Sequence, residues 1–387
     1  MNRRLARCYN IENLRKLAKK RLPAALFEYI DGVAEDGVTG RSNRTAFADY
    51  QLLPKTLVDV EQVDTSITLF GEKHSSPMIL CPTAFTRSFH HLGEVAVARA
   101  ARKADLVYTL STVSNTSIED IATIGSKRWF QIYVYRDRAL LKEFMQRAKE
   151  SSYQALCLTV DASIPGNREH DLRNGLVIPP RPSLATILEA ALHPYWCWHM
   201  LTSPPIVTAN VTGSSRLDTS SDPKALLQYM AEQLAINLSW DDVAWMREQW
   251  QGPFLIKGIL HADDARQAAS IGIDGIVVSN HGGRQLDHAP APLQVLPEIV
   301  DAVGDKCEII IDSGFRRGTD IIKALALGAK ACMIGRPYLY GLAAAGEAGV
   351  ERALHLLNEE LQRNMRLLGC TSITELTPSC LRRANSP

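Results

Sequence analysis

The sequence predicts an α/β protein built as a (β/α)8 barrel, and three observations lead to that fold class. Eight short runs rich in Val, Ile and Leu recur along the chain, with amphipathic stretches between them. The runs are continuously apolar, which is typical of parallel strands covered by helices on both faces. Eight β-then-α units favour a closed barrel over an open sheet. The runs cover residues 78–84, 106–112, 129–135, 155–161, 254–260, 275–281, 308–314 and 331–337.

The segments around these runs complete one domain over residues 1–387. Residues 1–75 are predicted to form a mostly helical lead-in, broken at Pro23, because proline interrupts a helix. The barrel covers 76–341, and an amphipathic helix with a short tail closes the chain over 342–387. The stretch from Asp161 to Phe254 is about three times as long as the roughly 30 residues of a βα crossover, which predicts an insertion over about 175–235.

Composition excludes several classes of function. The chain has 43 Lys and Arg against 42 Asp and Glu and 7% aromatic residues, which argues against nucleic-acid binding. The N-terminus lacks the apolar stretch of a secretory signal, and no run is long enough to span a membrane. The eight cysteines are scattered without a C-x-x-C pair, as expected of free thiols in a reducing cytoplasm. We therefore expect a cytoplasmic protein without a metal site.

Nearly every predicted strand ends in polar or ionisable residues. Barrel enzymes place their chemistry at the carboxyl ends of the strands. A packed core does not call for such residues, because a buried polar group without a partner costs about 1–3 kcal/mol. The candidate residues are Pro82, Thr83 and Ala84, then Ser111, Gln131 with Tyr133, Thr159 with Asp161, Lys257, Ser279 through Arg284, Asp312 to Arg316, and Gly335 with Arg336.

The segment SNHGGRQLD (279–287) is the densest of these strand ends. His281 is the natural general base, since a histidine accepts a proton near neutral pH. Two glycines allow the backbone to turn so that Arg284 points into the same mouth and binds a substrate carboxylate. Asp161 is placed to orient the imidazole, and Arg168 to supply a second guanidinium. The alternatives are a core histidine, an N-cap at Asp161 and a surface salt bridge at Arg168.

The other strand ends suggest two anion sites. The segments IDSGFRRG and IGRP follow strands seven and eight of the barrel, where barrels commonly bind a phosphate. Gly314 and Gly335 allow the phosphate to approach the backbone closely, and Arg316 and Arg336 can pair with it. Tight turns with solvated arginines are the alternative. Lys257 is surrounded by apolar residues and needs an anionic partner, unless it serves as a Schiff-base nucleophile.

Together these motifs resemble the FMN-dependent 2-hydroxy acid dehydrogenase and oxidase family over about residues 10–380. The segments SNHGGRQLD, LTVD, FQIYVY, LIKG, IDSGFRRG and IGRP carry the resemblance. Within the family, the bacterial mandelate dehydrogenases look most similar, followed by the lactate dehydrogenases. The resemblance implies a (β/α)8 barrel, bound FMN and a homotetramer.

The resemblance also implies a role for each candidate residue. His281 is the expected base and Asp161 its partner, while Arg284 and Arg168 grip the substrate carboxylate. Tyr29 and Tyr133 belong to the substrate pocket, and Lys257 faces the flavin ring. The expected FMN contacts are Pro82, Thr83, Ala84, Ser111, Gln131, Thr159 and Ser279 at the ring or ribityl chain, and Asp312, Gly314, Arg316, Gly335 and Arg336 at the ribityl chain and phosphate.

The expected reaction is oxidation of an (S)-2-hydroxy acid, mandelate-like or L-lactate, to the 2-keto acid. Electrons then pass from FMN to a quinone or another acceptor. The alternative is an oxidase that reduces O2 to H2O2, and Ala84 favours some oxygen reactivity because many of the dehydrogenases carry glycine there. A Schiff-base aldolase acting through Lys257 and a scaffold without activity are remote alternatives.

The predicted insertion contains a segment suited to a membrane surface, which would place the protein at the cytoplasmic face of the inner membrane. Residues 179–207 include Tyr195, Trp196 and Trp198 with few charges, and such side chains favour the bilayer interface. The near-zero net charge argues against a basic membrane clamp, so these aromatic residues would provide most of the binding. A lid, an oligomer contact or disorder are the alternatives for the same segment.

Overall fold

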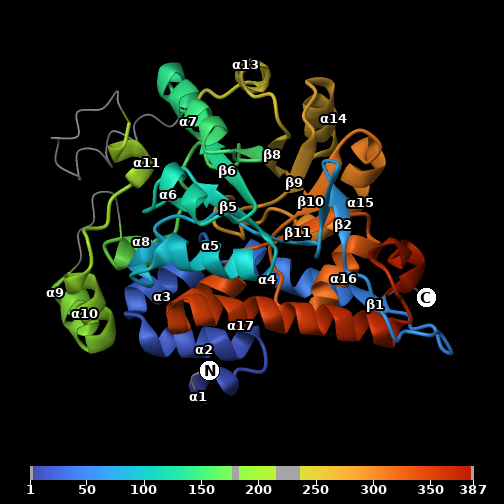
Figure 1. Cartoon of the computed structure of the whole chain (residues 1–387), viewed down its shortest axis with the longest axis horizontal. Coiled ribbons are helices and arrows are strands. Elements are labelled where there is room, and N and C mark those ends of the chain that lie inside the picture. The colour runs from blue at the N-terminus through green and yellow to red at the C-terminus, as the bar shows by residue number, and fades with distance from the viewer. Residues whose placement is uncertain (1–2, 177–182, 215–235, 385–387) are drawn as a thin grey trace.

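All eight predicted strands are present, and they form a closed parallel barrel (Figure 1). The computed structural model describes residues 3–176, 183–214 and 236–384. Around the barrel the strand order is β10-β11-β4-β5-β6-β7-β8-β9. The predicted fold class is therefore confirmed. The strands are β4 (Met78–Leu80), β5 (Val107–Ser111), β6 (Arg128–Tyr133), β7 (Ala155–Thr159), β8 (Phe254–Ile259), β9 (Gly275–Val278), β10 (Glu308–Ile311) and β11 (Ala331–Ile334).

Alternate residues of each strand belong to two separate cores. Phe130 and Leu158 pack in the large core that includes the helices, whereas Trp129 and Cys157 pack in a second, smaller core. Successive side chains of a strand point to opposite faces, so the smaller core fills the barrel interior. Towards the carboxyl ends the same alternation continues with polar residues: Ser111, Gln131, Thr159, Lys257, Ser279 and Asp312.

A hairpin of β2 (Ile67–Leu69) and β3 (Glu72–His74) supplies further residues to the barrel interior. Leu69 belongs to the interior core, and the ring of Phe70 lies 5.7 Å from that of Trp129, centroid to centroid. A Cβ atom on Gly275 would be 2.7 Å from the Phe70 ring, so a larger residue there would displace that ring. The interior is thus apolar near the amino ends of the strands, and the polar residues are confined to the opposite end.

Each strand is followed by a helix, as predicted. The last helix, α17 (Arg336–Leu368), starts directly after β11, earlier than the expected position 342, and its backbone breaks at Ala345 and Gly346. It packs along α2 and α5. The other helices of the barrel are α5 (Gly93–Lys103), α6 (Ile118–Thr123), α7 (Arg138–Glu150), α13 (Trp240–Gln249), α14 (Ala262–Ser270), α15 (Pro292–Val303) and α16 (Gly318–Ala326).

The lead-in is helical only as far as Asp49. It contains α1 (Arg3–Ala6), α2 (Ile11–Arg21), α3 (Ala24–Asp31) and α4 (Val38–Thr45), and Pro23 separates α2 from α3 as predicted. Beyond Asp49 the expectation of a mostly helical segment is wrong. There β1 (Tyr50–Leu52) pairs antiparallel with β12 (Leu381–Arg383), so a tertiary contact with the C-terminal tail outweighs local helix propensity.

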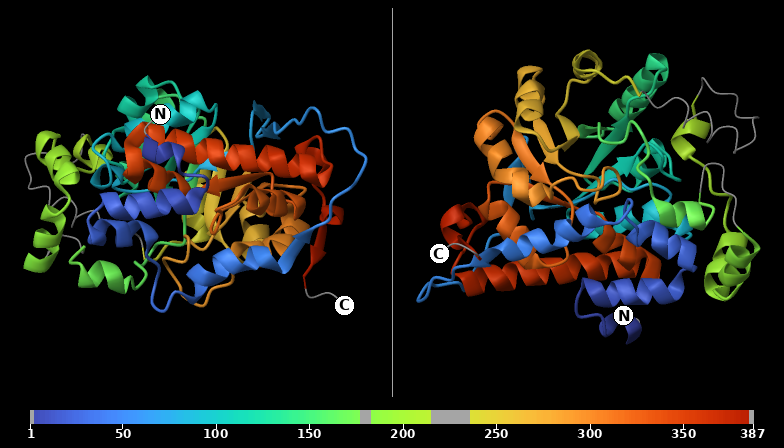
Figure 2. Two further views of the ribbon diagram at one scale, coloured as in Figure 1. Left: turned by 90° about the horizontal axis from the view of Figure 1, so that it is seen from below. Right: turned by 180° about the vertical axis from the view of Figure 1, so that it is seen from behind.

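The long connection between β7 and β8 carries additional helices. These are α8 (Glu169–Arg173), α9 (Leu184–Ala191), α10 (Pro194–Thr202) and α11 (Ala209–Thr212), while residues 177–182 and 215–235 of the predicted insertion lie outside the described residues. Figures 1 and 2 show α9 and α10 at the edge of the molecule, away from the barrel. Among the described residues, no helix has the length and apolar character needed to cross a membrane.

A half-buried carboxylate, that of Asp31, fixes α3 to its neighbours. Arg15 donates from Nε and Nη2 to the two oxygens of Asp31 at 2.8 and 2.6 Å, and the Tyr340 hydroxyl donates to the same carboxylate at 2.6 Å. Burial alone would raise the pKa of Asp31, but these hydrogen bonds outweigh it and lower the pKa to about 2. Helices α2, α3 and α17 are joined through this one side chain.

We predict that Asp31→Asn lowers the free energy of unfolding by about 2 kcal/mol at neutral pH. The folded-state pKa lies below the unfolded value, so this stability is present above pH 4 or so and is lost as pH falls towards about 2. The difference between variant and wild type should therefore shrink with acidification in denaturant titrations. Glu12→Gln is the control, because Glu12 contacts the same arginine at 3.0 Å but is 41% exposed. An equal loss in both variants would contradict the account.

Candidate active site

A cavity of about 330 Å³ opens at the carboxyl ends of the barrel strands. It collects residues from every strand end that the sequence analysis singled out. Of the predicted site residues, only Asp161 and Ser279 do not line it. The predicted residues that do are Tyr29, Pro82, Thr83, Ala84, Ser111, Gln131, Tyr133, Thr159, Arg168, Lys257, His281, Arg284, Asp312, Gly314, Arg316, Gly335 and Arg336.

His281 and Asp161 form a hydrogen-bonded pair beside the cavity. The Nδ1 atom of His281 lies 2.9 Å from Oδ1 of Asp161, which comes from the loop after β7. Burial alone would raise the pKa of Asp161, but the nearby charges of His281 and Lys257 lower it. An ionised Asp161 accepts a hydrogen bond from Nδ1–H, which leaves Nε2 as the basic nitrogen of the neutral imidazole.

The backbone around His281 adopts an uncommon conformation. His281, Gly282 and Gly283 have φ angles of 58°, 69° and 73°, in the left-handed region that favours glycine. A Cβ atom on Gly283 would lie 2.8 Å from the backbone of Gly40, in α4. The two glycines therefore permit the turn after β9 that the motif predicted, and Gly283 also permits a close contact with the lead-in that was not predicted.

Lys257 is a buried ammonium group with polar partners on two strands. Only 3% of Lys257 is exposed. Its Nζ donates to Ser279 Oγ at 2.8 Å and lies 3.1 Å from an oxygen of Asp312. Burial opposes the charge, but Asp312 and Asp161 raise the pKa of Lys257 above its ordinary value. The amine is thus held protonated, which opposes a Schiff-base role because that chemistry needs the neutral amine.

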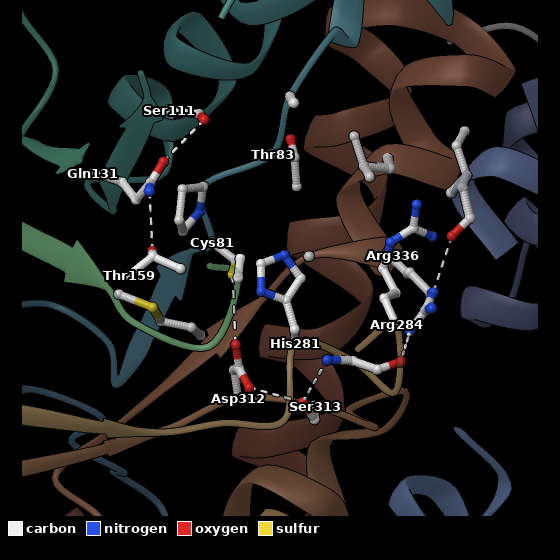
Figure 3. Close-up of a pocket in the computed structure, with 18 of the residues that line it drawn as sticks. Cys81, Thr83, Ser111, Gln131, Thr159, His281, Arg284, Asp312, Ser313 and Arg336 are labelled. Carbon is white, nitrogen blue, oxygen red and sulfur yellow. Dashed lines mark hydrogen bonds between the residues drawn. The ribbon is translucent and has the colours of Figure 1, made fainter. Parts of the chain in front are cut away.

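A row of side chains crosses three strands on one side of the cavity. The Ser111 hydroxyl donates to Gln131 Oε1 at 2.9 Å, and Gln131 Nε2 donates to Thr159 Oγ1 at 3.0 Å. Figure 3 shows this row facing His281, with Arg284 and Arg336 on the other side. The row fixes the orientation of the Gln131 amide.

Arg284 and Arg168 both lie close to Tyr29 of α3. The guanidinium carbons of Arg284 and Arg168 are 5.0 and 5.9 Å from the centre of the Tyr29 ring. Arg284 Nη1 also donates to the carbonyls of Tyr29 and Gly32 at 2.7 and 3.0 Å. The lead-in helix and the strand-end loops are therefore joined at this point, as expected for residues of one pocket.

The predicted phosphate residues make contacts within the chain. Arg336 donates to the carbonyls of Ile30, Gly282 and Gly32 at 2.7–2.9 Å, and Arg316 Nη1 donates to its own neighbour Phe315. A Cβ atom on Gly314 would be only 1.9 Å from the carbonyl oxygen of Asn43. The close approach predicted at Gly314 is therefore an approach to α4 of the lead-in.

The loop after β4 is held by a tyrosine of α17. Thr83 Oγ1 lies 2.7 Å from the Tyr338 hydroxyl, which donates to the Cys81 carbonyl at 2.7 Å. This chain of hydrogen bonds places Pro82, Thr83 and Ala84 along the cavity, with Gly335 opposite Cys81. Tyr133 lines the same cavity, and burial raises the pKa of its phenol.

Three residues of this region were not anticipated from the sequence. Asp171 is buried between the two arginines, three residues after Arg168, and that spacing on a helix was the available signal. Gln285 donates to the carbonyls of Asp161 and Ile164 at 2.8 and 2.9 Å. Thr208 lines the cavity from the long insertion, where no motif marks it.

Comparisons with known proteins place the chain in a family. A family model described as FMN-dependent dehydrogenase matches residues 18–383. The chain belongs to the FMN-dependent dehydrogenase family. It is 42% identical over 379 residues to an L-lactate oxidase of a Nostoc species, across 96% of this chain and 97% of the relative. It is 40% identical over 375 residues to the (S)-mandelate dehydrogenase of Pseudomonas putida, across 97% and 94%.

Solved structures of the FMN-dependent dehydrogenase family agree with this assignment. The chain matches a crystal structure of the monotopic membrane protein (S)-mandelate dehydrogenase with a TM-score of 0.92 and 40% identity. The match covers 97% of this chain and 99% of that chain. The resemblance inferred from the motifs is confirmed at the level of the family and its FMN dependence.

The residues of the cavity fit the cofactor of this family. The flavin ring carries polar edge atoms, and the row from Ser111 to Thr159 together with Lys257 supplies donors and acceptors for them. Arg316 and Arg336 line the same cavity with Gly314 and provide cations for a phosphate. The donor set thus matches both ends of FMN.

We predict that Gln131→Leu weakens FMN retention and lowers the free energy of unfolding by about 1–3 kcal/mol, because two buried hydroxyls lose their shared partner. The measurements are the ratio of FMN to protein after gel filtration and the thermal unfolding midpoint. Gln154→Leu is the control at the amino end of the barrel, where Gln154 bonds to Glu72. A wild-type FMN ratio in Gln131→Leu would exclude a role for the row in binding the cofactor.

Proposed function

We propose that the protein oxidises an (S)-2-hydroxy acid to the 2-keto acid with FMN as the immediate electron acceptor. The observation that carries the proposal is the His281–Asp161 pair at 2.9 Å, next to a cavity that Arg284 and Arg168 also line. A base beside two guanidinium groups suits a substrate with a hydroxyl and a carboxylate on adjacent carbons.

In this proposal the two arginines bind and orient the substrate carboxylate, so that the hydroxyl-bearing carbon lies beside the imidazole. His281 then accepts the substrate proton at Nε2, while Asp161 holds Nδ1 and stabilises the imidazolium that forms. Among the described residues, Asp161 Oδ1 bonds to His281 and Oδ2 has no side-chain or backbone hydrogen-bond partner. The carboxylate therefore interacts mainly with the histidine.

When bound, FMN supplies the two-electron chemistry that the side chains lack. The ammonium group of Lys257 is positioned to stabilise negative charge that develops at that side of the cavity. Its bonds to Ser279 and Asp312 fix it before the reaction starts, so no reorganisation is needed as charge develops.

The apolar part of the cavity supports an aromatic, mandelate-like substrate, with L-lactate as the second candidate. Tyr29, Phe85 and Phe89 line it together with Val113, and the Tyr29 and Phe89 rings are 6.0 Å apart, centroid to centroid. Phe85 has a left-handed φ of 55°, a conformation that a bulky residue rarely adopts. Such aromatic surroundings favour a flat apolar substituent over a methyl group.

The electron acceptor that we propose is a quinone, with O2 as the alternative. The exposed apolar side chains of α9 and α10, in the long connection after β7, suit a membrane surface and so support a membrane-dissolved quinone. Ala84, which lines the cavity, supports oxygen reactivity. Admitting O2 or a soluble quinone to the reduced protein separates the two acceptors.

We predict that His281→Gln still binds FMN but loses nearly all flavin reduction by (S)-mandelate or L-lactate under anaerobic conditions. Removal of a general base typically costs about 10²–10⁴-fold in rate. Stopped-flow absorbance of the flavin measures the step directly. His288→Gln, in the same loop and exposed, is the control and should reduce normally. Near-normal reduction in His281→Gln would remove His281 from the mechanism.

We also propose that the surface of α9 and α10 contacts a membrane. Its large side chains are unusually exposed, from 52% at Ile187 to 84% at Leu201, whereas soluble proteins rarely expose large apolar patches. Trp196, expected on this surface, instead packs inward and donates to the Ser88 carbonyl at 2.8 Å. Residues 179–182 of the predicted segment lie outside the described residues. The exposed side chains are Leu184, Ile187, Leu188, Leu192, Tyr195, Trp198 and Leu201.

We predict that replacing Leu184, Leu188 and Leu201 with serine moves the protein from the membrane fraction to the supernatant. Each leucine contributes about 1.5–3 kcal/mol when fully buried, so three substitutions weaken membrane partitioning by several orders of magnitude. The measurement is sedimentation with phospholipid vesicles. Leu53, Leu57 and Leu367 are exposed elsewhere, and their replacement with serine is the matched control. Equal sedimentation of both triple variants would contradict the membrane proposal.

A further inference from the structure

Asp171 is a buried carboxylate that the proposed chemistry leaves unused. Only 6% of its surface is exposed, although it lies on the short helix α8 near the cavity. Its Oδ2 atom is 3.2 Å from Arg168 Nε and 4.0 Å from Arg284 Nη2. Among the described residues, that oxygen accepts no hydrogen bond of acceptable geometry. The carboxylate therefore faces the two arginines chiefly as a charge.

The two arginines need such a charge because they repel each other. Both lie within 6 Å of the Tyr29 ring centre, and the side chain of Arg284, in the loop after β9, is only 14% exposed. Burial lowers the pKa of Arg284, and the positive charge of Arg168 lowers it further. One carboxylate between two guanidinium groups reduces this repulsion and leaves one positive charge uncompensated.

Other charges around Asp171 lie nearer to solvent. Glu28 of α3 is 3.9 Å from Nδ1 of His170, and both side chains are close to half exposed. Glu28 also accepts a hydrogen bond from Asn174 at 2.6 Å. Burial raises the pKa of Asp171, and the negative charge of Glu28 raises it slightly further. The positive charges of Arg284, Arg168 and His170 lower the pKa but do not outweigh burial. Solvent screens these outer charges more strongly than the group of three, in which Arg168, Arg284 and Asp171 are 29%, 14% and 8% exposed, so the three set the local field.

We propose that Asp171 is a positioning residue that orients Arg168 and Arg284 and sets their combined charge, so that the site selects monocarboxylate 2-hydroxy acids over dicarboxylates. A monoanion neutralises the remaining positive charge, whereas a dianion leaves an excess negative charge in a buried site, which is costly. The inference rests on the proposed function, in which these two arginines bind the substrate carboxylate.

The test compares oxalate with oxamate, which have the same shape but differ by one negative charge. Their dissociation constants are measured on the FMN-loaded protein from the change in the flavin spectrum. In Asp171→Asn the preference for oxalate over oxamate should rise at least about threefold, because one negative charge is removed next to the anion. A purely structural role would weaken both anions equally and leave the ratio unchanged.

Two variants control for this result. Asp171→Glu keeps the charge and should hold the ratio within about twofold of wild type. Glu169→Gln removes a carboxylate from the same helix, where Glu169 pairs with Arg173 at 2.5 Å in an exposed position, and should also leave the ratio unchanged. An unchanged ratio in Asp171→Asn, or an equal change in Glu169→Gln, would overturn the inference.

A second measurement covers the case in which Asp171→Asn fails to retain FMN. Arg168→Gln removes one positive charge, so oxalate should lose more affinity than oxamate, and the ratio should shift in the opposite direction. An unchanged ratio there overturns the inference as well. If neither anion changes the flavin spectrum of the wild-type protein, the arginines do not bind a carboxylate and the proposed function is wrong. If both anions bind the wild-type protein but the variants do not change the ratio, only the role of Asp171 is wrong.

Discussion

The buried ammonium of Lys257 is the constraint on which the site depends. A charge at 3% exposure inside the barrel is tolerated only with compensating partners, and Asp312, Asp161 and the Ser279 hydroxyl provide them from three neighbouring strand ends. His281 depends on the same charges, because Asp161 both interacts electrostatically with the Lys257 ammonium group and forms a hydrogen bond with the imidazole. The cavity is therefore charged before any ligand arrives, with a fixed cation on one side and a base on the other.

The lead-in completes this arrangement from outside the barrel. Arg284 and Arg336 donate to carbonyls at the C-terminal end of α3, where the helix dipole is negative and favours cations. Asp31 holds the same helix against α2 and α17. The position of Tyr29 in the cavity thus depends on contacts formed by residues far apart in the chain, and the site and the fold are stabilised together.

Sequence patterns predicted the barrel and the strand-end residues that line the cavity because both follow local rules, whereas Tyr29 was expected there only from the family resemblance. Continuous apolar runs mark buried parallel strands, and the polar residues at their ends must meet at one face, which brought His281 and Asp161 together although they are distant in sequence. The pairing of β1 with β12, the inward position of Trp196 and the reason for Gly314 depend on tertiary contacts that no local pattern records. Asp171 and Thr208 lie in the long connection between β7 and β8, where the spacing of Asp171 from Arg168 was the one available signal and no motif marks Thr208.

The most direct test of the account is anaerobic mixing of the FMN-loaded wild-type protein with (S)-mandelate, (R)-mandelate and L-lactate, followed by the flavin spectrum over time. In the proposed reaction the base, the two arginines and the bound flavin would each contact a different group on the chiral carbon, so that only one hand of the substrate reacts. We expect rapid flavin reduction by (S)-mandelate, slower reduction by L-lactate and none by (R)-mandelate. A flavin that stays oxidised with all three, or that both mandelates reduce equally, would contradict the central claim.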